Sequence, residues 1–74
     1  MTNAQIAALK AKVLMDIASH PGTRLRYIGS RIHYPHIKLL LIMDELEKAG
    51  KVKVVHYQDL ANMEFYNKWY IAEN

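Results

Sequence analysis

The 74 residues suffice for one small hydrophobic core but not for two, so we expect residues 1–74 to form a single domain. The absence of cysteine excludes a disulfide framework, a thiolate nucleophile and a cysteine zinc site, and it is typical of a cytoplasmic protein. The net charge of +3 is concentrated in residues 20–38, which carry four basic residues and no acidic one. Such a segment is typical of a polyanion site, although short basic helices are also often only solvated.

The first predicted element is a helix over residues 3–19. Thr2 and Gln5 have the spacing of a capping box, in which each side chain bonds the backbone of the other residue. Apolar residues then recur at helical spacing, at Ile6, Leu9, Val13 and Ile17. The helix ends before Pro21-Gly22, a pair typical of a turn. No apolar run in the chain is long enough to span a membrane.

Residues 23–50 predict a short extended piece and two further helices. Thr23 and Leu25 are expected to be extended, and a helix is expected over residues 26–32. Pro35 disfavours a helical conformation at the residue before it but suits the first turn of a new helix. A third helix is therefore expected over residues 35–49, with Gly50 providing its left-handed end.

After Gly50 the apolar period changes to two, which indicates a β-hairpin of two strands joined by the residues QDLANM. Phe65 and Trp69 share one face of the second strand, and we expect both in the core. The other face of the hairpin interleaves basic and aromatic residues. They either pack across the strands or stack on nucleic-acid bases, and they are Lys53, Tyr57, Tyr66, Lys68 and Tyr70.

This order of elements, together with the segment IGSRIHYPHIKLLLIMDELEKAGKV, resembles the winged helix-turn-helix domains. The resemblance implies an α+β fold in which three helices are followed by a C-terminal two-stranded β-hairpin, the wing. It also implies that helix 35–49 is the recognition helix and enters the major groove of duplex DNA. Domains of this type bind DNA most often, sometimes RNA, and in many complexes only protein.

From the resemblance and the basic segment, we expect a small DNA-binding protein, a transcriptional regulator or accessory factor that binds duplex DNA mainly through phosphate contacts. Between Val54 and Asn67 there is no Lys or Arg, whereas Asp59 and Glu64 are present, so a wing tip in the minor groove would be repelled. The residues expected to contact DNA are Arg24, Arg26, Arg31, His36, Lys38, Leu41, Lys53 and Lys68.

The recognition helix also favours a second hypothesis, a protein-interaction module. Groove-reading helices usually offer Arg, Asn, Gln, Ser or Thr to base edges, and here only His36 and Lys38 can donate there. The outward positions of the helix are instead apolar, at Ile37, Leu40 and Leu41, which would suit a protein partner. We also expect a homodimer, formed by helix 3–19, whose second side is rich in alanine, or by the apolar flank of helix 35–49.

No enzyme or cofactor is expected. The sequence has no set of nucleophile, base and orienting group and no glycine loop that could cradle a phosphate. His33 and His36 are three residues apart but straddle a turn, with no carboxylate or cysteine near them in sequence to complete a metal site.

Overall fold

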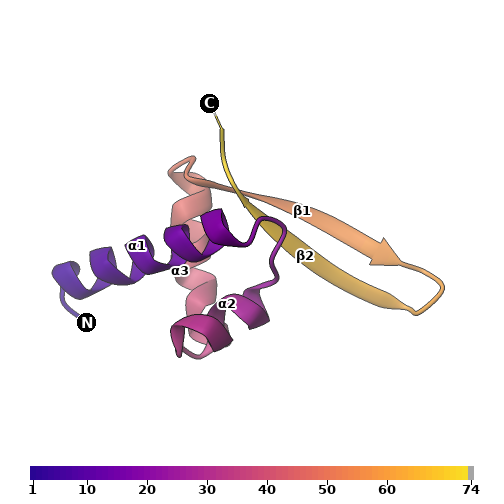
Figure 1. Cartoon of the computed structure of the whole chain (residues 1–74), viewed down its shortest axis with the longest axis horizontal. Helices are drawn as coiled ribbons and strands as arrows, with labels where there is room; N and C mark the ends of the chain where they lie inside the picture. The colour runs from indigo at the N-terminus through magenta and orange to yellow at the C-terminus, as the bar shows by residue number, and fades with distance from the viewer. Residues whose placement is uncertain (74) are drawn as a thin grey trace.

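The computed structural model describes residues 1–73 and contains three helices followed by an antiparallel hairpin. Figure 1 shows the helices grouped at one end of the molecule and the hairpin extending away from them. This is the predicted order of elements, with bounds that differ by a few residues. The elements are α1 (Asn3–Ser19), α2 (Leu25–Ile32), α3 (His36–Lys48), β1 (Val52–Asp59) and β2 (Glu64–Ile71).

Helix α1 begins with the predicted capping box. The Gln5 backbone N–H donates to Thr2 Oγ1 over 3.2 Å, and the Thr2 N–H donates to Gln5 Oε1 over 2.9 Å, so two backbone donors that the helix cannot satisfy are paired. Leu9, Val13 and Ile17 are buried. The alanine-rich side of the helix is exposed.

Helices α2 and α3 are joined by a tight turn at His33, which adopts the left-handed conformation with φ 57°. The Tyr34 N–H donates to the carbonyl oxygen of Gly29 over 2.9 Å, which closes the turn. A Cβ atom on Gly29 would lie 2.7 Å from the Tyr34 carbonyl oxygen, so this close approach requires glycine. Helix α3 ends before Gly50, whose φ of 73° gives the predicted left-handed stop.

The expectation for Leu25 was wrong, because this residue is the first of α2 rather than part of an extended piece. The extended conformation is confined to Thr23 and to Arg24, the residue that caps α2. Thr23 forms an antiparallel bridge with Trp69, in which the Trp69 N–H donates to the Thr23 carbonyl oxygen over 2.8 Å. The chain before α2 is thereby fixed to the edge of β2.

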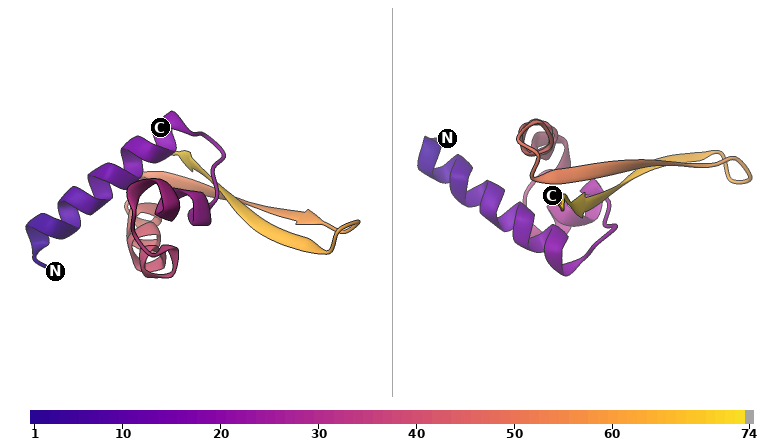
Figure 2. Two further views of the ribbon diagram at one scale, coloured as in Figure 1. Left: turned by 60° about the horizontal axis from the view of Figure 1, so that its bottom comes forward. Right: turned by 90° about the horizontal axis from the view of Figure 1, so that it is seen from above.

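The hairpin pairs Val52 with Ile71 at its base and Asp59 with Glu64 at its far end. Its turn occupies residues 60–63, so the strands run further than the predicted loop allowed. Trp69 is buried as expected, but the prediction for Phe65 was wrong, since its side chain is 66% exposed. Figure 2 shows the reason, because the hairpin continues well past the helices and only its base is covered.

The core lies where the three helices meet the base of the hairpin. The buried apolar side chains come from every helix and both strands, and they are Leu9, Val13, Ile17, Ile28, Leu39, Ile42, Met43, Leu46, Val52 and Trp69.

No helix within residues 1–73 combines the length and hydropathy needed to cross a membrane.

Candidate nucleic-acid interface

The outer side of α3 is an exposed row of apolar side chains. Four residues of this helix face the core, which leaves the remaining apolar residues on the opposite side of the wheel. Ile37, Leu40 and Leu41 are 66%, 53% and 67% exposed. We call these three residues the apolar ridge. Its exposure confirms that the surplus apolar residues of the helix are not used in the core.

The start of α2 brings two arginines to the hairpin side of the apolar ridge. The guanidinium carbon of Arg24 lies 3.8 Å from the ring centroid of Tyr66 in β2, so the side chain is stacked on this ring. Arg24 and Arg26 line a hollow of about 240 Å³ together with Leu40 of the ridge. Two cations therefore border the ridge on this side.

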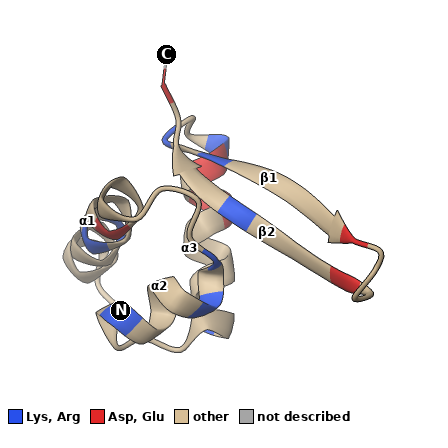
Figure 3. Cartoon of the chain, turned by 45° about the vertical axis from the view of Figure 1, so that its right-hand side comes forward, with Lys and Arg blue, Asp and Glu red and all other residues tan. Residues whose placement is uncertain are grey.

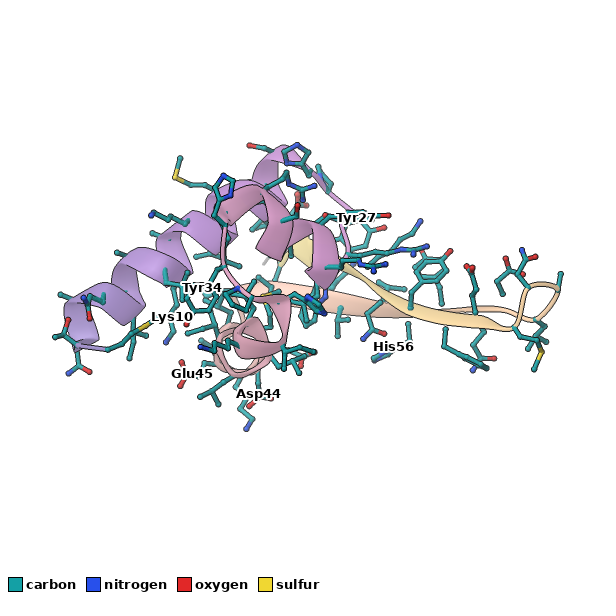
Figure 4. The ribbon with its side chains drawn as sticks, turned by 90° about the horizontal axis from the view of Figure 1, so that it is seen from below. Lys10, Tyr27, Tyr34, Asp44, Glu45 and His56 are labelled. Carbon is teal, nitrogen blue, oxygen red and sulfur yellow. The ribbon has the colours of Figure 1, made fainter. Side chains whose placement is uncertain are left out.

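Lys38 lies on the other flank of the apolar ridge. It is seven residues before Glu45, so the two side chains project from the same stripe of α3. Glu45 pairs with Lys10 of α1, with 2.9 Å between Oε2 and Nζ, which shows that this stripe faces α1 (Figure 4). The ridge is thus bordered by basic residues on both flanks. In residues 1–73, Arg24, Arg26 and Lys38 form no ion pair.

Arg31 is placed differently from the other basic residues of segment 20–38. Its Nε and a terminal nitrogen donate to the two carboxylate oxygens of Asp16 over 2.7 and 2.8 Å, and the same terminal nitrogen donates to Thr23 Oγ1 over 2.6 Å. The hydrogen bonds to Asp16 raise the pKa of Arg31. The charge of Arg31 is therefore offset, and its side chain ties α2 to α1.

The role of Asp16 was missed in the sequence because its partner lies fifteen residues further along the chain. A signal was nevertheless present, since Asp16 is the only acidic residue among residues 1–43. Its side chain is only 8% exposed, and a carboxylate that is removed from water needs a cation or hydrogen-bond donors. A buried carboxylate at this position is therefore expected to form an ion pair with one of the four basic side chains of segment 20–38.

The outer face of the hairpin carries the predicted row of basic and aromatic side chains. The rings of Tyr57 and Tyr66 are stacked across the strands, with centroids 5.7 Å apart and planes at 9°. Lys68 Nζ lies 4.7 Å from the Tyr57 ring centroid, and Lys53 Nζ lies 5.9 Å from that of Tyr70. Hydrogen bonding with Tyr57 raises the pKa of the Tyr70 hydroxyl. The rings thus pack against each other and against cations, as the cross-strand interpretation expected.

The far end of the hairpin is acidic and apolar. Asp59 and Glu64 face each other across the two strands (Figure 3), and the Asn62 side chain donates to an Asp59 carboxylate oxygen over 2.8 Å. This hydrogen bond lowers the pKa of Asp59 and favours its charged form. Leu60 and Met63, in the turn, are exposed, as is Phe65, which lies on the opposite face of the hairpin from Asp59 and Glu64. We call these residues, Asp59, Leu60, Met63, Glu64 and Phe65, the hairpin tip.

His33 and His36, near the helix turn, are exposed. His36, at the first position of α3, and Arg26 line a second hollow of about 620 Å³ beside the turn. Across the described 73 residues, no three His, Asp or Glu side chains are grouped so as to hold a metal ion.

No protein-family model and no curated protein matches the sequence. Among solved structures, the chain is similar to the crystal structure of the transcriptional regulator SlyA, with a TM-score of 0.64 and 17% sequence identity. The match covers 88% of this chain and 43% of the SlyA chain, so this chain spans less than half the length of that regulator. The fold is a winged helix-turn-helix of the α+β class. This follows from the order of three helices and an antiparallel hairpin, together with the structural match.

Proposed function

We propose that this protein binds duplex DNA, mainly through phosphate contacts, and acts in the cytoplasm as a small transcriptional regulator or accessory factor. The proposal rests on one arrangement, the apolar ridge of α3 with Arg24 and Arg26 on one flank and Lys38 on the other. A helix lying in a major groove has a phosphate strand on each side, so cations on both flanks match both strands. The fold that the chain shares with the regulator SlyA supports this use of α3.

The chemistry of the ridge predicts weak discrimination between base sequences. Ile37 and Leu41 can contact thymine methyl groups, but they cannot form the bidentate hydrogen bonds that distinguish bases. Lys38 and His36 are the donors at the start of α3. Most of the binding energy is therefore assigned to phosphates, which carry no sequence information.

The hairpin contributes through its outer face rather than through its tip. Lys53 and Lys68 are held over tyrosine rings on this face, so part of the entropy of fixing them is already lost before binding. The acids of the hairpin tip would be repelled by a minor groove. Arg31 supports the interface indirectly, because its pair with Asp16 fixes α2 against α1.

Titration of a labelled duplex at two salt concentrations tests this function. Affinity is expected to be micromolar or better at low salt and to fall steeply as salt rises, because bound cations release counterions from the DNA. Arg26→Ala should weaken binding to all sequences alike and reduce the salt slope by about one. Lys12→Ala, on the exposed side of α1, is the matched control. Absence of salt-dependent binding in the unmodified protein would contradict the proposal.

The exposure of the apolar ridge also favours a second candidate function, a protein-interaction module. Three large apolar side chains on one side of a single helix form a patch that is costly to leave in water. A homodimer formed by α1 or by α3 would be one such interaction. No catalytic role is proposed for the chain.

A further inference from the structure

The hairpin tip has no role in the proposed contact with DNA, although it is the most apolar exposed part of the hairpin. Leu60, Met63 and Phe65 project beyond the helices and are exposed. Asp59 and Glu64 place two carboxylates side by side across the strands. Like charges directly opposite in a hairpin are unfavourable, so this pair would gain from a nearby cation.

The apolar ridge is complementary to the hairpin tip, because both surfaces are apolar and the charges around them are opposite. Each surface has three exposed apolar side chains. The tip carries two acids, whereas Arg24, Arg26 and Lys38 border the ridge and form no ion pair within the described residues. The one acid on the same side of α3 as the ridge, Asp44, is paired with Lys48. Burying the apolar groups of one surface against the other would remove both from water and bring opposite charges together.

The two surfaces of one chain lie apart. The hairpin leaves the helices at its base and extends away from them, as all views in Figures 1 and 2 show, so its tip is remote from α3. We propose that the hairpin tip of one copy docks on the apolar ridge of a second copy. In the proposed arrangement, which is reciprocal about a two-fold axis, each copy places its tip on the ridge of the other and the assembly closes as a dimer.

The charge pattern favours a second copy over other occupants of the ridge. The turn places Leu60 and Met63 between the two acids in sequence, and within it Asn62 donates to the Asp59 carboxylate from both its side chain and its backbone N–H. The alanine-rich side of α1 is the other surface on which two copies could meet, but it has no charge pattern that identifies a partner. The tip and the ridge, in contrast, carry opposite charges beside their exposed apolar side chains.

Such a dimer covers the residues proposed to contact DNA. The carboxylates of the docked tip take the place of phosphates beside Arg24 and Arg26, so the dimer and the DNA complex exclude each other. Free monomer would bind DNA, and high protein concentration without DNA would favour the dimer. The dimer itself does not depend on DNA binding and is tested without DNA.

Sedimentation equilibrium of the full chain at about 100 μM tests the dimer, since this concentration populates any dimer of micromolar affinity. The unmodified chain is expected to have the mass of two chains. Arg26→Glu and Glu64→Arg each place like charges in the contact, so each variant alone is expected to be monomeric. Mixed in equal amounts, the two variants restore opposite charges at both contacts, and the mass of two chains should return.

Arg26, Glu64 and the control position Lys12 are all exposed, so the substitutions are compatible with the fold. Circular dichroism would verify that each variant is folded. Lys12→Glu, with the same charge change as Arg26→Glu but on α1, is the control and should remain a dimer. The proposal is overturned if the unmodified chain is a monomer, if either variant alone dimerises as strongly as the unmodified chain, or if the mixture stays monomeric. Because the samples contain no DNA, none of these results bears on the duplex titration.

Discussion

The guanidinium carbon of Arg24 lies 3.8 Å from the centroid of the Tyr66 ring and joins the start of α2 to the third residue of β2. Tyr66 in turn stacks on Tyr57 across the hairpin. The bridge between Thr23 and Trp69 holds the preceding residue to the same strand. The start of α2 and the hairpin are therefore expected to move as one unit, which keeps the cations beside the apolar ridge in place.

The stacking of Arg24 on Tyr66 predicts an energetic coupling between these residues. Arg24→Ala and Tyr66→Leu should each lower the free energy of unfolding, and a double-mutant cycle should give a coupling of about 0.5–1 kcal/mol. Urea denaturation of the four proteins measures it. Lys38→Ala paired with Tyr66→Leu is the control cycle and should be additive. A coupling no larger than in the control would show that the stacking does not contribute to stability.

The pair between Arg31 and Asp16 predicts a structural rather than a DNA-binding effect. Arg31→Ala should lower the free energy of unfolding by about 1–3 kcal/mol, because it leaves the mostly buried Asp16 carboxylate without its charged donor. Arg26→Ala removes an exposed side chain that forms no ion pair in residues 1–73, and it should cost under about 0.5 kcal/mol. Denaturation curves compare the two variants.

In DNA affinity, the Arg31→Ala and Arg26→Ala variants should rank in the opposite order from their ranking in stability. Arg26→Ala is expected to weaken duplex binding more than Arg31→Ala, because the charge of Arg31 is already offset by Asp16. The comparison is made at a temperature where both variants are folded. Equal losses of affinity would mean that Arg31 leaves Asp16 and contacts phosphate in the complex.

The turn of the hairpin predicts a pH effect on stability. Asn62 bonds the ionised form of Asp59 and lowers its pKa, so this stabilisation is present above the ordinary pKa of aspartate and is lost as pH falls through the lowered value. Asn62→Ala should raise the pKa of Asp59, followed by NMR of its carboxyl carbon. An unchanged pKa would show that the Asn62 side chain does not bind the carboxylate in solution.

The features that were predictable from sequence are those set by local spacing. The capping box at Thr2 and Gln5 and the glycine stop at Gly50 each depend on a few adjacent residues, and both are present in the structure. The exposed apolar ridge was also predictable, because the positions of a helix that face the core follow from its period.

The features that failed or were missed depend on distant contacts. Phe65 alternates correctly with its neighbours, but the period of a strand does not tell how far the helices extend along it. Arg31 belongs to the basic segment by sequence, yet Asp16 on another helix offsets its charge. The stacking of Arg24 on Tyr66 likewise joins residues more than forty positions apart. Which basic residues of segment 20–38 are left without an ion pair in residues 1–73 is therefore decided by the tertiary structure.

Leu41→Arg separates the two candidate functions of the apolar ridge. If the ridge faces DNA, a new cation at this exposed position should preserve or strengthen duplex binding and steepen the salt slope by about one. If the ridge instead binds an apolar protein surface, the buried charge should abolish capture of that partner, because an unpaired charge in an interface is strongly unfavourable. Fluorescence anisotropy of a labelled duplex gives the affinity and slope. Met15→Arg, a matched change at an exposed apolar residue of α1, should leave both nearly unchanged. A folded Leu41→Arg protein that binds duplex more weakly than the unmodified chain would contradict the placement of α3 against DNA.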